Sequence, residues 1–68
     1  MVGAMTLLNS SAIYAVDYNG FTGELTIYFR SSGRGYTFSG VPAQVAYGLM
    51  RADSPGTYYN IHIRGYYN

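Results

Sequence analysis

The sequence predicts a small α+β domain, in which a three-stranded antiparallel meander is covered on one face by one helix. Three observations predict it: apolar and polar residues alternate in the first half, glycine-rich turns separate the alternating segments, and the apolar period becomes helical after Pro42. A chain of 68 residues is long enough for one core. We therefore expect an N-terminal arm over residues 1–9 and a single domain over residues 10–68.

The chain opens with apolar residues, and we interpret residues 1–8 as an extended arm or a first edge strand. The strands of the meander are expected over residues 12–18, 24–30 and 36–39. The second is the clearest, because its apolar residues alternate strictly with Glu, Thr, Tyr and Arg. This alternation places Tyr28 and Arg30 on the face opposite the core. We expect Tyr18, Tyr36 and Tyr59 to pack inside.

A helix is expected over residues 42–51, because Pro42 suits a first helical turn and apolar residues then recur at a helical period. That apolar face comprises Val41, Val45, Leu49 and Ala52, and a second stripe holds Ala43, Tyr47 and Met50. Gly48 costs a helix about 1 kcal/mol relative to alanine, so we expect a close contact at this position.

Two structures are open for the tail over residues 54–68. Alternation of Tyr59, Ile61 and Ile63 with polar residues favours an edge strand. A short second helix is favoured by Ser54 as a cap, a proline after it and Gly65 as the stop.

The composition excludes several classes of function. The chain has nine tyrosines, no cysteine, one histidine and three acidic residues, and its four basic residues are all arginine. Without cysteine there is no disulfide and no thiolate metal site, which favours the cytoplasm. The apolar start has no basic flank and is too short to span a bilayer, so we expect no membrane partner. A chain of this length can bury only a small core, so we expect a homo-oligomer to supply further stability.

Catalysis is not expected, because His62 lies far in the sequence from Asp17 and Glu24 and no nucleophile motif accompanies it. We therefore predict that the protein is not an enzyme and has no cofactor. A metal site is not expected either, because zinc needs three or four closely spaced ligands.

The ordered motifs are similar to those of the KTSC domain family, which occurs at the C-terminus of some lysyl-tRNA synthetases and as stand-alone copies in bacteria and phages. The resemblance covers roughly residues 10–67. It is carried by Ser10-Ser11, Ile13, Val16 and Tyr18; by Leu25, Ile27 and Phe29; by Tyr36-Thr37-Phe38 and Val41-Pro42; by Val45, Leu49 and Ala52; and by Ser54, Gly56, Tyr58, Tyr59, Asn60 and Ile63. The resemblance implies a stand-alone phage or bacterial domain, a short helix for the tail and, as suggested for the family, RNA binding.

Tyrosine rings and arginines together predict a binding module for RNA or a phosphate-bearing nucleotide, such as a nucleotide signal held between subunits. The guanidinium group of arginine can donate two parallel hydrogen bonds to a phosphate, and bases stack on tyrosine rings. The loops at residues 31–35 and 53–57 expose backbone N–H groups that suit phosphate, although flexible connection and simple helix capping are the commoner roles of such loops. The expected ligand-binding residues are Tyr28, Arg30, Arg34, Arg51, Ser54, Gly56, Tyr58, Asn60, His62, Arg64 and Tyr66.

The alternative is a protein-binding adaptor or inhibitor that docks through Tyr47, Met50 and neighbouring tyrosines. Salt dependence separates the two hypotheses, because a phosphate ligand weakens steeply with salt and an apolar interface does not.

Overall fold

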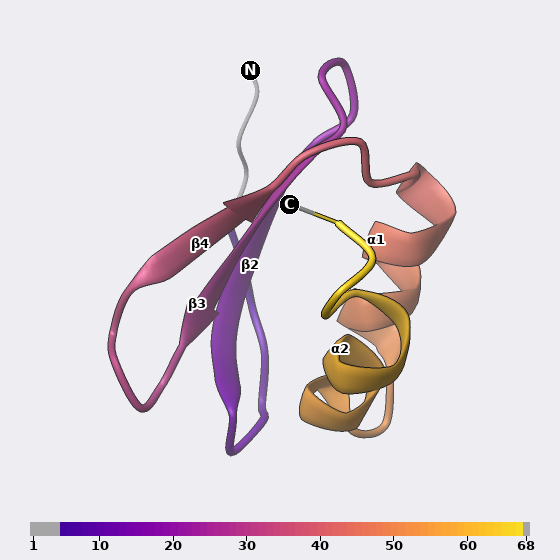
Figure 1. The fold of residues 1–68 in the computed structure, drawn as a ribbon. Helices are drawn as coiled ribbons and strands as arrows, with labels where there is room; N and C mark the ends of the chain where they lie inside the picture. The colour runs from indigo at the N-terminus through magenta and orange to yellow at the C-terminus, as the bar shows by residue number, and fades with distance from the viewer. Residues whose placement is uncertain (1–4, 68) are drawn as a thin grey trace.

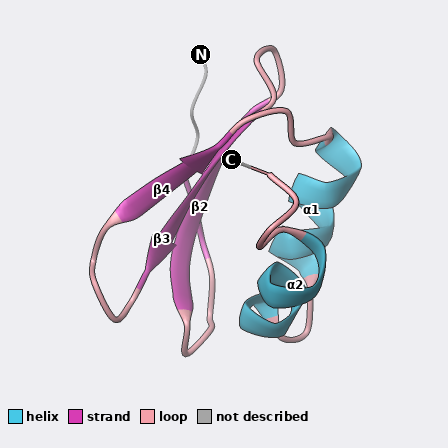
Figure 2. Cartoon of the chain, viewed as in Figure 1, coloured by secondary structure: helices cyan, strands magenta, loops and turns pink. Residues whose placement is uncertain are grey.

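The structure is a computed structural model that describes residues 5–67. A four-stranded antiparallel sheet in the order β1-β2-β3-β4 carries two helices on one of its faces (Figures 1 and 2). The elements are β1 (Met5–Leu7), β2 (Ile13–Asn19), β3 (Glu24–Phe29), β4 (Gly35–Phe38), α1 (Ala43–Arg51) and α2 (Pro55–His62). The predicted α+β class is confirmed.

The prediction of three strands is wrong, because the N-terminal segment adds a fourth. β1 pairs with β2 through Met5↔Asp17 and Leu7↔Ala15, so this part of the expected arm is an edge strand. Three residues are too few to show a reliable alternation, which is why the pattern left both possibilities open. Residues 1–4 of the expected arm lie outside the described part of the chain.

The core lies between the sheet and the helices. β2 and β3 supply Ile13, Val16, Leu25 and Ile27, and the helical layer supplies Val41, Ala46, Leu49 and Ile63, all essentially inaccessible to water. The alternation in β3 predicted its two core residues correctly. The predicted helical face did not include Ala46, which is buried in the structure. The buried face of α1 is therefore wider than the predicted stripe.

The tail forms the helix α2 and not an edge strand. Tyr59 and Ile63 stand four residues apart and both pack toward the core, whereas Ile61 between them is 57% exposed. Tyr59 contacts two strands edge-on, with ring centroids 5.2 Å from Phe29 and 5.9 Å from Phe38. A strand would place Tyr59, Ile61 and Ile63 on one face, so the exposure of Ile61 between the two packed residues distinguishes α2 from a strand.

The Gly48 backbone is the point at which α1 and α2 approach closely, as the sequence predicted. The Tyr58 ring of α2 packs on it, and the Tyr58 hydroxyl donates a hydrogen bond to the Val45 carbonyl at 3.1 Å. Tyr18 also helps to hold α1, because its hydroxyl donates to the Val41 carbonyl at 2.7 Å. Both tyrosines are therefore used by the fold.

The prediction that Tyr36 packs inside is wrong. Its side chain points to the helical side of β4 and contacts Phe29 edge-on at 5.7 Å, but 48% of it is exposed. β4 is an edge strand, and the neighbouring helical layer covers Tyr36 only in part. Tyr18 and Tyr59 are half-buried against the core, as expected for inward-facing rings.

Candidate functional site

The face of the sheet that points away from α1 and α2 is called the open face here. Its residues follow from the strand register, because directly paired residues share one face and successive residues alternate. Ile27 points into the core, so its neighbours Thr26 and Tyr28 point outward. The open face comprises Met5, Leu7, Tyr14, Ala15, Asp17, Asn19, Glu24, Thr26, Tyr28, Gly35 and Thr37, of which Ala15 is fully buried.

A β-bulge in β2 brings Tyr14 onto the open face. The register between β2 and β3 shifts between Ile13 and Ala15, so Tyr14 is the extra residue of the bulge. Its ring lies beside that of Tyr28, with centroids 5.8 Å apart and planes tilted by 43°. Two half-buried aromatic rings thus lie side by side on the central strands.

Arg30 completes this aromatic pair. Its guanidinium carbon lies 5.9 Å from the centroid of the Tyr14 ring, close enough for a cation–π contact. Nη2 donates a hydrogen bond to the Leu8 carbonyl at 3.2 Å, and Nε donates to the Ser10 carbonyl. These contacts hold the guanidinium over the ring and leave the side chain exposed to solvent.

Glycine at position 35 gives the Tyr28 ring its position. A Cβ atom at Gly35 would stand 2.6 Å from Cε1 of Tyr28, a distance that no real side chain accepts. The ring therefore lies across β4 because β4 has no side chain there. Beside it, the hydroxyls of Thr26 and Thr37 share a hydrogen bond of 2.9 Å across the two strands.

An open hollow of about 410 Å³ adjoins the aromatic pair. Its lining consists of Leu7, Leu8, Asn9, Tyr14 and Arg30. Leu7 is 75% exposed, so apolar surface stands free at the rim. Asn9 offers an amide that can donate and accept hydrogen bonds. The hollow thus combines a ring, apolar surface and polar groups, the chemistry that suits a heterocyclic base.

Charge on this side of the molecule is mixed. Arg34 is exposed in the connection between β3 and β4, and Arg30 is exposed at the same end of the sheet, directly after β3. Asp17 and Glu24 lie among the outward-facing residues of β2 and β3. The two arginines can meet phosphates at one end of the sheet, while the two carboxylates limit the total attraction.

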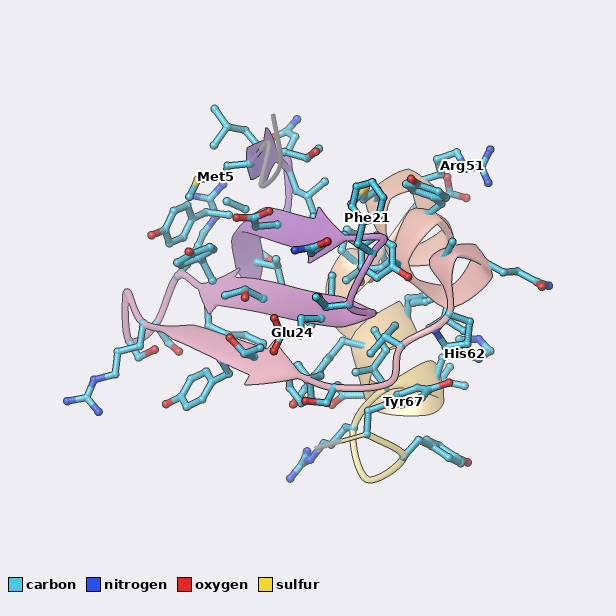
Figure 3. The ribbon with its side chains drawn as sticks, turned by 90° about the horizontal axis from the view of Figure 1, so that it is seen from above. Met5, Phe21, Glu24, Arg51, His62 and Tyr67 are labelled. Atoms are coloured by element: carbon cyan, nitrogen blue, oxygen red, sulfur yellow. The ribbon has the colours of Figure 1, made fainter. Side chains whose placement is uncertain are left out.

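The structure does not unite the eleven predicted ligand-binding residues. Tyr28, Arg30 and Arg34 belong to the open face and its adjoining turn. The other eight belong to the helical side: Arg51 ends α1, and Ser54, Gly56, Tyr58, Asn60, His62, Arg64 and Tyr66 lie in or beside α2. Met5 and His62 mark opposite sides of the molecule in Figure 3.

Several residues of the helical group already have structural partners. Tyr58 packs α2 on α1, and His62 lies against the Tyr58 ring at 4.4 Å between centroids. The Ser54 hydroxyl donates to Oγ1 of Thr57 at 3.0 Å. These contacts give three of the eight residues on the helical side a structural role.

The two residues suggested for protein docking, Tyr47 and Met50, differ in their exposure to solvent. Tyr47 is 49% exposed and contacts Tyr18 edge-on at 5.9 Å. Met50 is half-buried and packs against the core. Phe21 in the turn between β2 and β3 is 92% exposed. Sequence reasoning missed Phe21, because a single apolar residue in a turn carries no period.

Within residues 5–67, no three histidine, cysteine or acidic side chains gather closely enough to hold a metal ion. Neither helix of this part of the chain has the length and hydropathy that crossing a bilayer requires.

Comparison with known proteins shows similarity to a domain family and to a solved structure. Residues 9–67 match the KTSC domain. The crystal structure of a KTSC domain protein from Yersinia pestis is similar to this one, with a TM-score of 0.89 and 29% sequence identity over 96% of this chain and 90% of that chain. No curated protein matches the sequence.

Proposed function

The chain belongs to the KTSC domain family, as its motifs indicated, and from this premise we propose that it is a small non-catalytic module that binds RNA or a phosphate-bearing nucleotide through the open face. The observation that carries the proposal is the pair of rings, Tyr14 and Tyr28, on the central strands of a sheet whose other face is covered by helices. We place this activity in the cytoplasm, where such ligands occur.

Base stacking supplies most of the binding energy in this proposal. Each base that stacks on an aromatic side chain contributes roughly 1–3 kcal/mol, and every base has a flat face. Sheets with aromatic residues on an open face bind single-stranded RNA in this way in other folds. Tyr14 and Tyr28 offer places for one or two bases, and the hollow beside Tyr14 accepts a third group. The likeness to those folds is an analogy.

In this proposal, Arg30 and Arg34 bind the phosphates of the ligand. Arg34 stands in an exposed turn, so it can follow the backbone of a bound strand. Arg30 is held by two carbonyls and contributes charge and a stacking plane. With two arginines and two nearby carboxylates, the affinity depends more on stacking than on charge, which suits a formal net charge of only +1.

A titration with fluorescein-labelled RNA of about eight nucleotides, read by anisotropy at low salt, tests the proposal. We expect binding by the wild type and a loss of about 5–150-fold on Tyr28→Ala, the factor that corresponds to one stacked base. Tyr47→Ala is the matched control, because it removes an exposed tyrosine on the helical side and should leave affinity unchanged.

The alternative, a protein-binding adaptor, rests on the exposed rings of Phe21 and Tyr47. It predicts no binding to RNA or to nucleoside mono-, di- or triphosphates at low salt. A wild-type chain that binds none of these, or a Tyr28→Ala variant with full affinity, would refute the open-face proposal and favour the adaptor.

A further inference from the structure

The outer edge of β4 is unpaired in the described structure. β4 closes the sheet and pairs only with β3, in a register without a bulge. The amide of Phe29 donates to the Arg34 carbonyl at 3.2 Å, which fixes the alternation of the antiparallel ladder. By this alternation, Gly35 and Thr37 direct their backbone N–H and C=O groups away from β3. These groups can accept another strand.

The sequence of this edge lacks the usual protection against pairing. Edge strands are commonly blocked by charged side chains, by proline or by a bulge. The four residues of β4 are Gly-Tyr-Thr-Phe, so none of them is charged and none is proline. The edge therefore has free backbone hydrogen-bonding groups and no side chain of the kinds that commonly block strand pairing.

We propose that two copies of the chain pair through β4, antiparallel about a two-fold axis at Tyr36, and join their sheets into one of eight strands. The outward groups are self-complementary in this register: Gly35 of one copy pairs with Thr37 of the other, and the reverse pair completes the seam. An antiparallel seam also keeps the two Arg34 side chains at opposite ends, whereas a parallel one would bring like charges together.

Tyr36 indicates that the occupant is a second copy. The axis places Tyr36 directly opposite Tyr36 of the second copy, as a non-hydrogen-bonded pair with Cα atoms about 4.5 Å apart. The two rings then cover each other on the helical side of the sheet, where the single chain leaves 48% of the ring exposed. Aromatic cross-strand pairs of this kind stabilise sheets.

The other side of the seam is also shaped for this partner. The Tyr28 ring lies across Gly35 toward the edge of β4. The residue that would face Gly35 from the second copy is Thr37, whose small side chain leaves room for that ring.

A two-fold axis perpendicular to the sheet keeps both open faces on one side, so the dimer has one continuous open face. This inference does not depend on what that face binds.

A single cysteine gives a direct test, because the chain contains none. In the proposed seam, Tyr36→Cys places two thiols on directly opposite residues, within the Cα range of disulfides. Leu7→Cys on the β1 edge is the matched control, since Leu7 is the more exposed side chain. Under mild oxidation we expect cysteine 36 to form covalent dimers at least about tenfold faster than cysteine 7, because its partner is already in place. Equal rates at the two positions would overturn the proposal.

Sedimentation velocity of the cysteine-free protein provides the second measurement. The seam is short, so we expect a dimer with a dissociation constant of roughly 1–100 μM, as for small transient interfaces. Thr37→Pro should abolish it, because proline removes an outward N–H and spares the ladder with β3. Leu7→Pro should leave it intact.

A monomer up to about 0.5 mM, well above that range, would overturn the proposal. So would a dimer that survives Thr37→Pro, because its interface would then lie elsewhere. If circular dichroism shows that Thr37→Pro does not fold, Tyr36→Arg takes its place. That change puts two like charges at the axis, and a dimer that persists in it refutes the seam.

Discussion

The ring of Tyr58 in α2 packs against the bare backbone of Gly48 in α1, and its hydroxyl donates to the Val45 carbonyl at 3.1 Å. A Cβ atom at position 48 would stand 2.8 Å from Cζ of that ring and nearer still to its hydroxyl oxygen. Glycine in a helix interior ordinarily destabilises it, so this contact explains why glycine is present there. The pair fixes how the two helices meet over the sheet.

Gly48→Ala is therefore expected to lower the free energy of unfolding, although alanine is the better helix former by about 1 kcal/mol. We expect a net loss of about 1–3 kcal/mol from overpacking, measured by urea denaturation. Tyr58→Phe removes the nearest atom, so Gly48→Ala should cost less in that background than in the wild type. A stabilising Gly48→Ala would show that the helices tolerate the extra methyl group without strain.

The packing of α2 predicts opposite outcomes for two isoleucines. Ile63 is fully buried and Ile61 is 57% exposed. Ile63→Ala should cost about 2–5 kcal/mol, and Ile61→Ala should change stability by less than about 0.5 kcal/mol. An edge strand would place both side chains on one face, so similar costs at the two positions would contradict the helix. Chemical denaturation followed by circular dichroism measures both.

The isoleucines also show what the sequence could predict of the fold. The alternation in β3 arises because one face packs on the core, so the pattern and the structure have the same cause. In the tail, Tyr59 and Ile63 are four residues apart, and this spacing fits both a period of two and a helical turn. Only packing of Tyr59 against Phe29 and Phe38, which are distant in sequence, distinguishes the two.

The open face was predictable only in part, for a similar reason. Tyr28 follows from alternation, because it neighbours the buried Ile27. Tyr14 does not, since a bulge moves it out of the simple alternation of β2. The place of Gly35 under the Tyr28 ring depends on the register between β3 and β4. The carbonyls that hold Arg30 belong to a connection whose path no local pattern describes.

Gly35→Ala should disturb the open face without disrupting the core. The added methyl group cannot coexist with the Tyr28 ring in its present position, so the ring must move off β4. If the proposed function holds, RNA affinity should fall by about fivefold or more, the smallest loss expected for one stacked base. The control is Gly20→Ala, where a Cβ atom would meet only Tyr18 at an ordinary 3.9 Å. Unchanged affinity in Gly35→Ala would contradict the role of the Tyr28 ring.

Salt dependence should report the number of arginines that contact phosphate. For a single strand, the slope of log K against log salt is about −0.7 for each phosphate neutralised, so Arg30 and Arg34 together predict a slope of about −1.4. Arg34→Ala should halve that slope, because Arg34 is exposed and contributes no core contact. Arg51→Ala removes an exposed arginine at the end of α1 and serves as the control for net charge. If the slope falls equally in both variants, the salt dependence of RNA binding reflects the net charge of the protein and not a phosphate contact of Arg34.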